Sequence, residues 1–292
     1  MKQIAIIGPT ASGKTDIALT LAKNINANIL SLDSLSIYKE IDIASAKPTK
    51  EQRDNIKHFG IDEIYINEPF SVTKFFDIYK NAYKITQKES KSLIIVGGTS
   101  FYLKSMIDGL SYKIQPSNNT LLKVQDALHD LQQAYNFIKK MDFYYANKIS
   151  SHDSYRIQKW YEIYFETNII ATKYFKQNLR KPLIKDIEIY NIEINKETLK
   201  QKISQRTSKM ISSGLIDEVF KLEKKYTREP KPMKAIGIAE TLEYLDGKLS
   251  FKMLHDKISL NTLKLAKRQI TFNKSQFNNI RNMNSLSKNM LK

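Results

Sequence analysis

A glycine-rich segment near the N-terminus has the residue types and spacing that bind phosphate groups. It matches the pattern G-x-x-x-x-G-K-[ST] between an apolar run and a helical pattern. The glycines let backbone N–H groups converge on phosphate oxygens, the lysine neutralises the anion, and the final hydroxyl can bind Mg²⁺. The segment therefore predicts a P-loop for a diphosphate or triphosphate. Its residues are Gly8, Pro9, Thr10, Ala11, Ser12, Gly13, Lys14 and Thr15.

The sequence lacks the carboxylate that nucleotide-hydrolysing P-loop proteins place after a buried strand to hold Mg²⁺. The apolar run 93–96 ends instead in Gly97-Gly98-Thr99. A carboxylate does follow a different apolar run, at Asp33. Taken alone, an Asp at the end of a strand is most often a turn or cap residue. Hydrolysis is therefore disfavoured, and Asp33 stays open between a turn-forming role and a chemical one.

Short apolar runs that alternate with helical patterns must position these residues. Residues 4–7, 29–32 and 93–96 have the character of buried parallel strands, and apolar spacing after the P-loop and at 75–83 favours helices. Strands alternating with helices indicate a parallel sheet, whose ligands lie beyond the carboxyl ends of the strands. We therefore expect the P-loop, Asp33 and Thr99 to meet at one edge of the sheet.

The pattern changes after Leu110. Apolar residues repeat at helical spacing from 121 to 138, and no strand pattern returns until 187–194. The fold class predicted is α/β: a P-loop NTPase-like parallel sheet core, residues 1–112 and 178–292, interrupted by a helical insertion domain at 113–177. The last twenty residues, from Asn273, are poor in apolar residues and are expected to form a frayed tail.

The composition is that of a globular protein with a strongly basic charge. The 292 residues carry a formal net charge of +17, with 41% hydrophobic and 26% charged residues. This charge favours a polyanionic partner such as nucleic acid, although a bias toward lysine could supply part of it. The absence of cysteine excludes disulfides and thiolate chemistry. Because the first apolar run is too short for a signal peptide or a membrane span, we expect a cytoplasmic protein without a membrane partner.

Several motifs, taken in their order along the chain, resemble the tRNA dimethylallyltransferase family. The resemblance covers about residues 3–272, and the combination is far more specific than a P-loop alone. It implies transfer of the dimethylallyl group from dimethylallyl diphosphate to N6 of an adenine beside the anticodon of tRNA. The motifs are the P-loop, residues 33–38, 42–49 and 96–102, Arg206, and residues 214–219, 236–240 and 266–271.

The resemblance also implies roles for individual residues. The prenyl diphosphate would occupy the P-loop with Lys14 and with Mg²⁺ on Thr15, and Arg206 would pair with phosphate. Asp33 would be the general base for the N6 proton of a flipped-out adenine, and Thr99 would help to hold the reacting region. The residues implied to contact the tRNA anticodon stem-loop are Asp33, Ser34, Leu35, Ser36, Thr99, Tyr155, Arg156, Ile157, Gln158 and Lys159.

Four residues depart from the family pattern. Tyr155 and Lys159 stand where Gln and Arg are expected, while Leu263 and Phe272 stand where Arg and Trp are usual. Lysine keeps the charge of arginine but loses its forked geometry, so phosphate contact survives better than base recognition. The spacing of the aromatic residues that follow favours a helix core over a base-stacking surface; they are Trp160, Tyr161, Tyr164 and Phe165.

Two other functions remain open at this point. A nucleotide or small-molecule kinase would use the same P-loop and turn over ATP, and a tRNA-binding relative without catalysis would fit the departures. Arg206 taken alone also fits a solvated helix face. The four histidines show no metal-ligand spacing. We expect Mg²⁺ as cofactor, tRNA and dimethylallyl diphosphate as partners, and a monomer.

Overall fold

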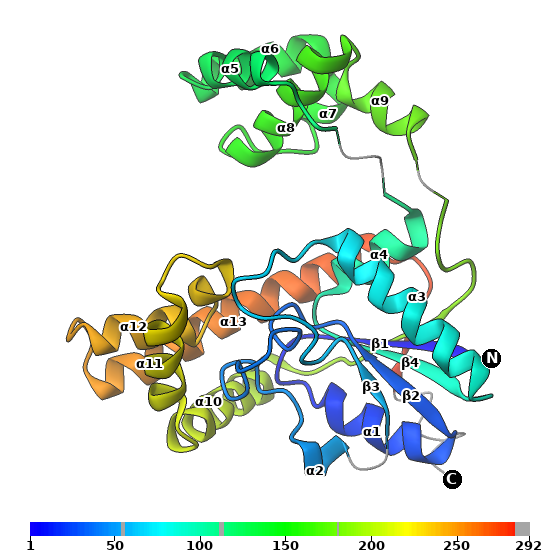
Figure 1. Ribbon diagram of the computed structural model, residues 1–292, viewed down its shortest axis with the longest axis vertical. Coiled ribbons are helices and arrows are strands. Elements are labelled where there is room, and N and C mark those ends of the chain that lie inside the picture. The colour runs from blue at the N-terminus through cyan, green and yellow to red at the C-terminus, as the bar shows by residue number, and fades with distance from the viewer. Residues whose placement is uncertain (54–55, 111–113, 180, 284–292) are drawn as a thin grey trace. The chain divides into compact units, whose positions relative to one another are not determined.

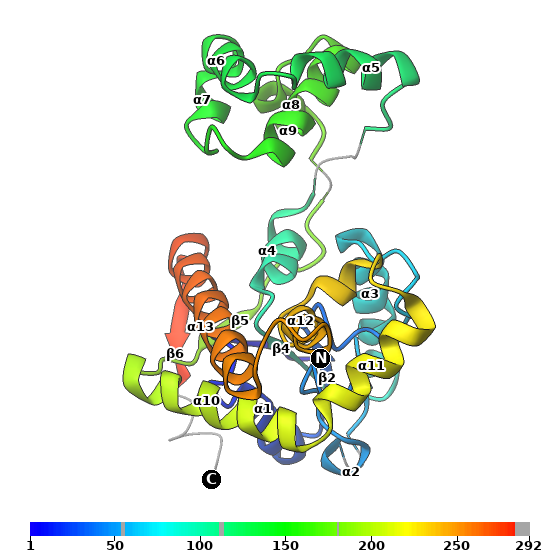
Figure 2. The same ribbon diagram turned by 90° about the vertical axis from the view of Figure 1, so that its left-hand side faces the viewer.

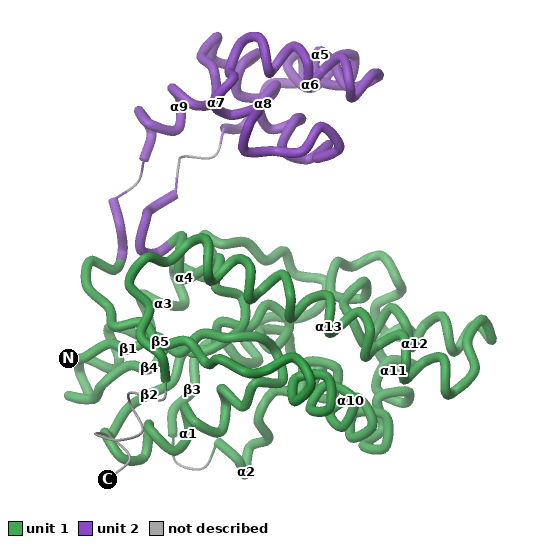
Figure 3. The backbone as a smooth tube through the Cα atoms, turned by 180° about the vertical axis from the view of Figure 1, so that it is seen from behind, with its two compact units in different colours: residues 1–105, 184–292 green, residues 106–183 purple. Residues whose placement is uncertain are grey.

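The chain folds into two compact units. The computed structural model describes residues 1–53, 56–110, 114–179 and 181–283. Residues 1–105 with 184–292 form the first unit and residues 106–183 form the second, as Figure 3 shows. The predicted insertion, 113–177, lies inside the second unit, and its first boundary lies outside the described residues.

The first unit is built on a six-stranded sheet in which every neighbouring pair of strands is parallel. The strand order is β3-β2-β4-β1-β5-β6. The strands predicted at 4–7, 29–32, 93–96 and 187–194 are thereby confirmed, with shorter limits for the last. The strands are β1 (Gln3–Ile7), β2 (Ala27–Ser31), β3 (His58–Phe59), β4 (Ser92–Gly97), β5 (Glu188–Asn191) and β6 (Ile280–Asn282).

Helices cover both faces of this sheet (Figure 1). Ala18 and Leu21 of α1 pack against Ile4 and Ile6, which share one face of β1. Helix α3 lies on the other face, and its Tyr79 hydroxyl donates to Oε1 of Gln3 at 2.9 Å. The crossover helix predicted around 75–83 is thus confirmed. The helices before the second unit are α1 (Lys14–Asn24), α2 (Lys50–Arg53), α3 (Val72–Lys88) and α4 (Ser100–Asp108), which continues into it.

The helices after β5 build a further core beside the segment that follows β2. Ile37 and Ile41 of that segment pack with Val219, Leu242 and Leu254. Figure 2 shows α10 and α13 side by side, where their apolar residues share a small cluster. This packing brings both helices to the edge of the sheet. The elements are α10 (Lys196–Ser212), α11 (Leu215–Tyr226), the 3₁₀ helix η1 (Lys231–Lys234), α12 (Ile238–Leu245) and α13 (Phe251–Gln276).

The C-terminal segment corrects the sequence prediction. Residues 273–283 are not a frayed tail, because α13 continues to Gln276 and β6 then pairs with β5. Asn273, Phe277 and Met283 are buried. A strand at a sheet edge is stabilised by backbone hydrogen bonds, which a composition poor in apolar residues does not reveal. Residues 284–292 lie outside the described residues.

The second unit is a cluster of short helices around its own core. Trp160 is fully buried and its Nε1 donates to Asp142 at 3.0 Å. Burial raises the pKa of Asp142, but its hydrogen bonds to Thr172 and Trp160 outweigh this effect and hold the pKa below its ordinary value. Within the described ranges, no helix is long and apolar enough to cross a membrane. The helices are α5 (Asn118–Ala127), α6 (Leu131–Met141), α7 (Phe143–Ala146), α8 (Ser154–Thr167) and α9 (Ala171–Gln177).

Candidate active site

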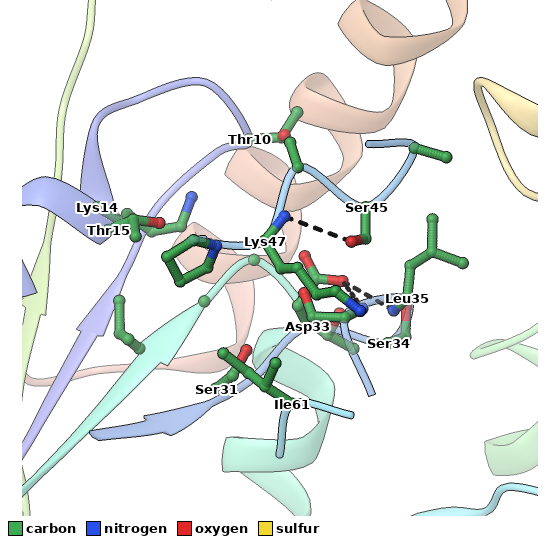
Figure 4. Close-up of a pocket in the computed structure, with 18 of the residues that line it drawn as sticks. Thr10, Lys14, Thr15, Ser31, Asp33, Ser34, Leu35, Ser45, Lys47 and Ile61 are labelled. Atoms are coloured by element: carbon green, nitrogen blue, oxygen red, sulfur yellow. Dashed lines mark hydrogen bonds between the residues drawn. The ribbon is translucent and has the colours of Figure 1, made fainter. Parts of the chain in front are cut away.

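A cavity of about 240 Å³ lies at the carboxyl edge of the parallel sheet, entirely within the first unit. Its walls come from the P-loop, the turn after β2, residues 44–48, the loop after β4, and helices α10 and α13. Figure 4 shows Lys14 and Thr15 on one side, Asp33, Ser34 and Leu35 on another, and Thr10 above them. The predicted meeting of the P-loop, Asp33 and Thr99 is confirmed. The main polar residues of the lining are Thr10, Lys14, Thr15, Asp33, Thr99, Arg206 and Gln269.

The P-loop connects β1 to α1. Gly13 has φ +88°, a left-handed conformation that favours glycine and lets the chain turn into the helix. Thr10, Lys14 and Thr15 line the cavity. The N-terminus of α1 therefore faces the site with its partial positive charge, which favours an anion there. The rest of the predicted loop shapes the turn without lining the cavity; these residues are Gly8, Pro9, Ala11, Ser12 and Gly13.

Lys14 is a buried cation beside other charges. Its Nζ donates to the carbonyl oxygen of Pro9 at 2.5 Å. Burial lowers the pKa of Lys14 to about 7, with a further lowering by Arg206 and an opposing effect of Asp33. A phosphate group beside the amine would raise this pKa, because a neighbouring anion stabilises the charged form. The site is therefore built to become fully cationic when an anion enters.

Asp33 forms a turn and also faces the cavity. Its Oδ1 accepts hydrogen bonds from the backbone N–H groups of Leu35, at 2.8 Å, and Ser36, at 3.2 Å, so it does form a turn. The residue also lines the cavity, and its charge raises the pKa values of Lys14 and Arg206 against the effect of burial. The turn fixes the orientation of a carboxylate that faces two cations.

Thr99 is tied to the strand end that carries Asp33. The Thr99 N–H donates to the carbonyl oxygen of Leu32 at 3.0 Å, and the Leu32 N–H donates to Val96 at 2.7 Å. A Cβ at Gly97 would lie 2.7 Å from the backbone of Leu32. This close approach requires glycine at position 97, the last residue of β4, and leaves no room for a carboxylate side chain there.

Arg206 lies on α10 and lines the cavity, so the solvated-helix interpretation of this residue was wrong. Burial lowers its pKa and the charge of Asp33 opposes that change. Its Nη2 donates to the carbonyl oxygen of Ser45 at 3.5 Å, a long contact. Among the described residues this is the one hydrogen bond of the guanidinium, so most of its donors stay available to a ligand.

Residues 42–48 form a wall that is held by charged side chains. The Glu218 carboxylate of α11 accepts from three successive backbone N–H groups, those of Asp42, Ile43 and Ala44, at 2.8–2.9 Å. The Lys47 ammonium is almost completely buried and pairs with Asp42 at 2.6 Å and with Asp62. The backbone that carries Ser45 toward Arg206 is fixed by these contacts.

Several residues that line the cavity were not predicted as site residues. Residues 44–48 and Gln269 belong to motifs that carry the family resemblance, and that membership is the signal that could have found them. His58, on β3, also lines the cavity. Burial lowers its pKa, with a smaller raising effect from its bond to Ile56.

The predicted tRNA-contacting segment 155–159 opens α8 in the second unit. Tyr155 is 67% exposed, and Arg156 is exposed and paired with Asp153 at 3.0 Å. Gln158 and Lys159 both contact the Glu162 carboxylate, at 2.8 Å and 2.5 Å. Gln158 and Lys159 are only partly exposed, because the Glu162 that they contact is buried.

Ile157 corrects the prediction for this segment. Its side chain is fully buried in the core of the second unit with Trp160 and Tyr161, so it is not accessible to RNA. The helix-core interpretation of the neighbouring aromatic residues is confirmed, since Tyr164 and Phe165 also pack against this core.

The two departures on α13 make apolar contacts. Leu263 packs with Leu199 and Ile203 of α10, and Phe272 lies edge-on to Phe277 at a centroid distance of 6.4 Å. In this chain, Leu263 joins α13 to α10, whereas Phe272 packs on the residue that ends its own helix.

A parallel sheet with a glycine-rich loop opening onto a helix beside a buried lysine defines a P-loop protein of the α/β class. The sequence model of the IPP transferase family matches residues 36–276. A tRNA dimethylallyltransferase from Sulfurovum sp. (strain NBC37-1) is 53% identical over 281 residues, which cover 96% of this chain and 93% of the relative. The chain belongs to the IPP transferase family.

Solved structures agree with this assignment. A tRNA isopentenylpyrophosphate transferase from Bacillus halodurans is 28% identical, with a TM-score of 0.70, and the match covers 96% of this chain and 89% of that one. A eukaryotic dimethylallyltransferase acting on tRNA shares the fold, with a TM-score of 0.82 at 23% identity, over 99% of this chain and 76% of that one.

Proposed function

We propose that the protein transfers the dimethylallyl group of dimethylallyl diphosphate to N6 of an adenine beside the anticodon of tRNA. The observation that carries the proposal is the convergence of Lys14, Arg206 and Asp33 on one cavity. Two cations suit a diphosphate, and a fixed carboxylate suits the proton of an amine. Relatives named tRNA dimethylallyltransferase support the choice of substrates.

The donor's diphosphate binds at the P-loop in this proposal. Backbone N–H groups at the start of α1 and the Lys14 ammonium contact its oxygens, and Arg206, which lines the same cavity, pairs with them as well. Negative charge builds on these oxygens as the bond between C1 and the diphosphate oxygen breaks. Fixed cations and dipoles stabilise this charge in the transition state more than in the ground state.

In this proposal, Asp33 is the general base for the acceptor, the N6 amine of adenine. The N6 amine is a weak nucleophile because its lone pair is delocalised into the adenine ring. The Asp33 carboxylate, oriented by Leu35 and Ser36, accepts an N6 proton as the N6–C1 bond forms, and the diphosphate leaves with the electron pair of the broken bond. Thr99, fixed beside Asp33 through Leu32, holds the reacting region.

The residues present fit Mg²⁺ bound chiefly through the donor. Mg²⁺ prefers oxygen ligands, keeps several waters and is commonly held by substrate phosphates with one or two protein groups. Thr15 supplies a hydroxyl at the cavity, and the described part of the chain has no cluster of three or more His, Asp or Glu that would form a dedicated cage. Thr15 would hold the ion, which when bound neutralises part of the diphosphate charge.

The tRNA anticodon stem-loop is the proposed macromolecular partner. Flipping the target adenine out of its stack costs a few kcal/mol and exposes N6 to a pocket. Ser34, Leu35 and Ser36 adjoin Asp33 and contact the RNA near the cavity. In the insertion, 113–177, the exposed side chains of Tyr155 and Arg156 and the partly exposed ones of Gln158 and Lys159 contact the phosphate backbone and loop bases. We also propose that the protein acts as a cytoplasmic monomer.

A comparison of two donors tests this function against the kinase alternative. The protein is incubated with tRNA and either dimethylallyl diphosphate or ATP with Mg²⁺; nucleosides from the digested tRNA are analysed by mass spectrometry, and the second reaction, with nucleotide acceptors added, is also analysed for ADP and phosphorylated acceptors. We expect one prenyl group on adenosine with the first donor and no phosphorylated product with the second. Phosphoryl transfer from ATP without prenylation would support a kinase, and neither product would support a relative without catalysis.

A further inference from the structure

Helix α13 places the side chain of Gln269 in the wall of the cavity. Oε1 of Gln269 accepts a hydrogen bond from the backbone N–H of Thr10 at 2.8 Å, a contact between residues 259 positions apart. Thr10 lies inside the P-loop, where converging N–H groups hold phosphate. One N–H group of the loop is therefore oriented by a side chain from the other end of the protein.

The Nε2 group of the same Gln269 amide lies against Gly98, in the loop after β4. A Cβ at Gly98 would lie 2.3 Å from Nε2 of Gln269 and 3.2 Å from its Cδ. Gly98 does not have the left-handed backbone conformation that would itself favour glycine. The space above Gly98 is thus required by Gln269, and a single amide spans the P-loop and the loop that carries Thr99.

We propose that Gln269 is a positioning residue that holds the P-loop against the loop after β4 in the geometry that receives diphosphate. The proposal rests on the proposed function, because it takes the P-loop as the donor site. A loop held in its binding geometry binds its ligand without a further ordering cost. Gln269→Ala leaves the Thr10 N–H without this partner and should weaken diphosphate binding by roughly 3- to 10-fold, the range of one net hydrogen bond.

Gly98→Ala should give the same defect without touching Gln269 chemically. The atom in the way of the new methyl group is the far end of a flexible side chain, so Gln269 moves aside and loses Thr10. Once Gln269 has been replaced by Ala, the same methyl group at position 98 meets no amide. The two substitutions should therefore be strongly non-additive, and the double variant should bind no worse than Gln269→Ala.

The test is titration of inorganic diphosphate with Mg²⁺ into wild type, the two single variants, the double variant and Gln276→Ala. Gln276 is an exposed residue of the same helix and serves as the matched control. We expect equal losses of affinity in both single variants and the double variant, no loss in the control, and a raised KM for the prenyl donor with a smaller change in kcat.

Thermal unfolding separates positioning from a purely structural role. Additive losses, or unchanged diphosphate affinity in Gln269→Ala with only a lower Tm, would overturn the proposal. Wild-type prenyl transfer is measured in parallel: its absence would overturn the proposed function, whereas its presence together with normal binding by Gln269→Ala would overturn the role of Gln269 alone.

Discussion

The charge state of the Lys14 amine depends on the groups beside it. Its pKa of about 7 results from burial and from Arg206, and only Asp33 opposes them. The sequence pattern predicted that this lysine would bind phosphate, because the P-loop motif is local. It could not predict the pKa, since Arg206 reaches the cavity through the packing of α10. For this residue, the sequence predicted the phosphate-binding role but not the pKa.

Binding of diphosphate should therefore be accompanied by proton uptake. Above pH 7 the Lys14 amine is mostly neutral, and an entering anion raises its pKa, so affinity should fall as the pH rises above that value. Calorimetric titrations in two buffers with different ionisation enthalpies, at a pH about one unit above the pKa, measure the uptake. Lys14→Arg, which stays charged, is the control. Equal proton uptake by both proteins would show that Lys14 is not the titrating group.

Helices and strands were predicted correctly where a local sequence pattern defines them. Buried strands such as β1 and β4 are continuous apolar runs, and α1 and α3 have clear helical spacing. The short strands β3 and β6 were missed, because two or three residues at a sheet edge depend on backbone pairing. The placement of Gln269 and residues 44–48 depends on how α11 and α13 pack, which no local pattern encodes.

Helix α11 should contribute stability through one carboxylate. Glu218→Ala removes the acceptor of three backbone N–H groups in residues 42–44, and we expect a loss of about 1–3 kcal/mol in the free energy of unfolding. Asp217→Ala is the matched control, because both acidic residues lie in the first turn of α11, where a negative charge interacts favourably with the helix dipole. Urea unfolding of both variants measures the two losses in the free energy of unfolding. Similar losses in the two variants would assign the effect to the dipole.

For the whole molecule, the formal charge of +17 is the property most relevant to RNA. Neutralising phosphates releases counterions, so tRNA affinity should fall steeply between low and physiological salt, while donor binding inside the cavity changes less. Filter binding of tRNA and titration of the donor over the same salt series measure both. A flat response of tRNA binding would mean that the charge reflects lysine-rich composition and not an RNA surface.

The most direct test of the account is single-turnover prenyl transfer by wild type and Asp33→Asn, with saturating tRNA and donor. Asn keeps the size of the side chain and can still orient the amine, but it cannot accept the proton. We expect wild type to prenylate an adenosine beside the anticodon, and the variant to bind both substrates normally and react slower by about 10² to 10⁴, the range of a positioned general base. A variant rate within about threefold of wild type would remove Asp33 from the mechanism and leave it as a turn residue. No prenylated adenosine with wild type would contradict the proposed function itself.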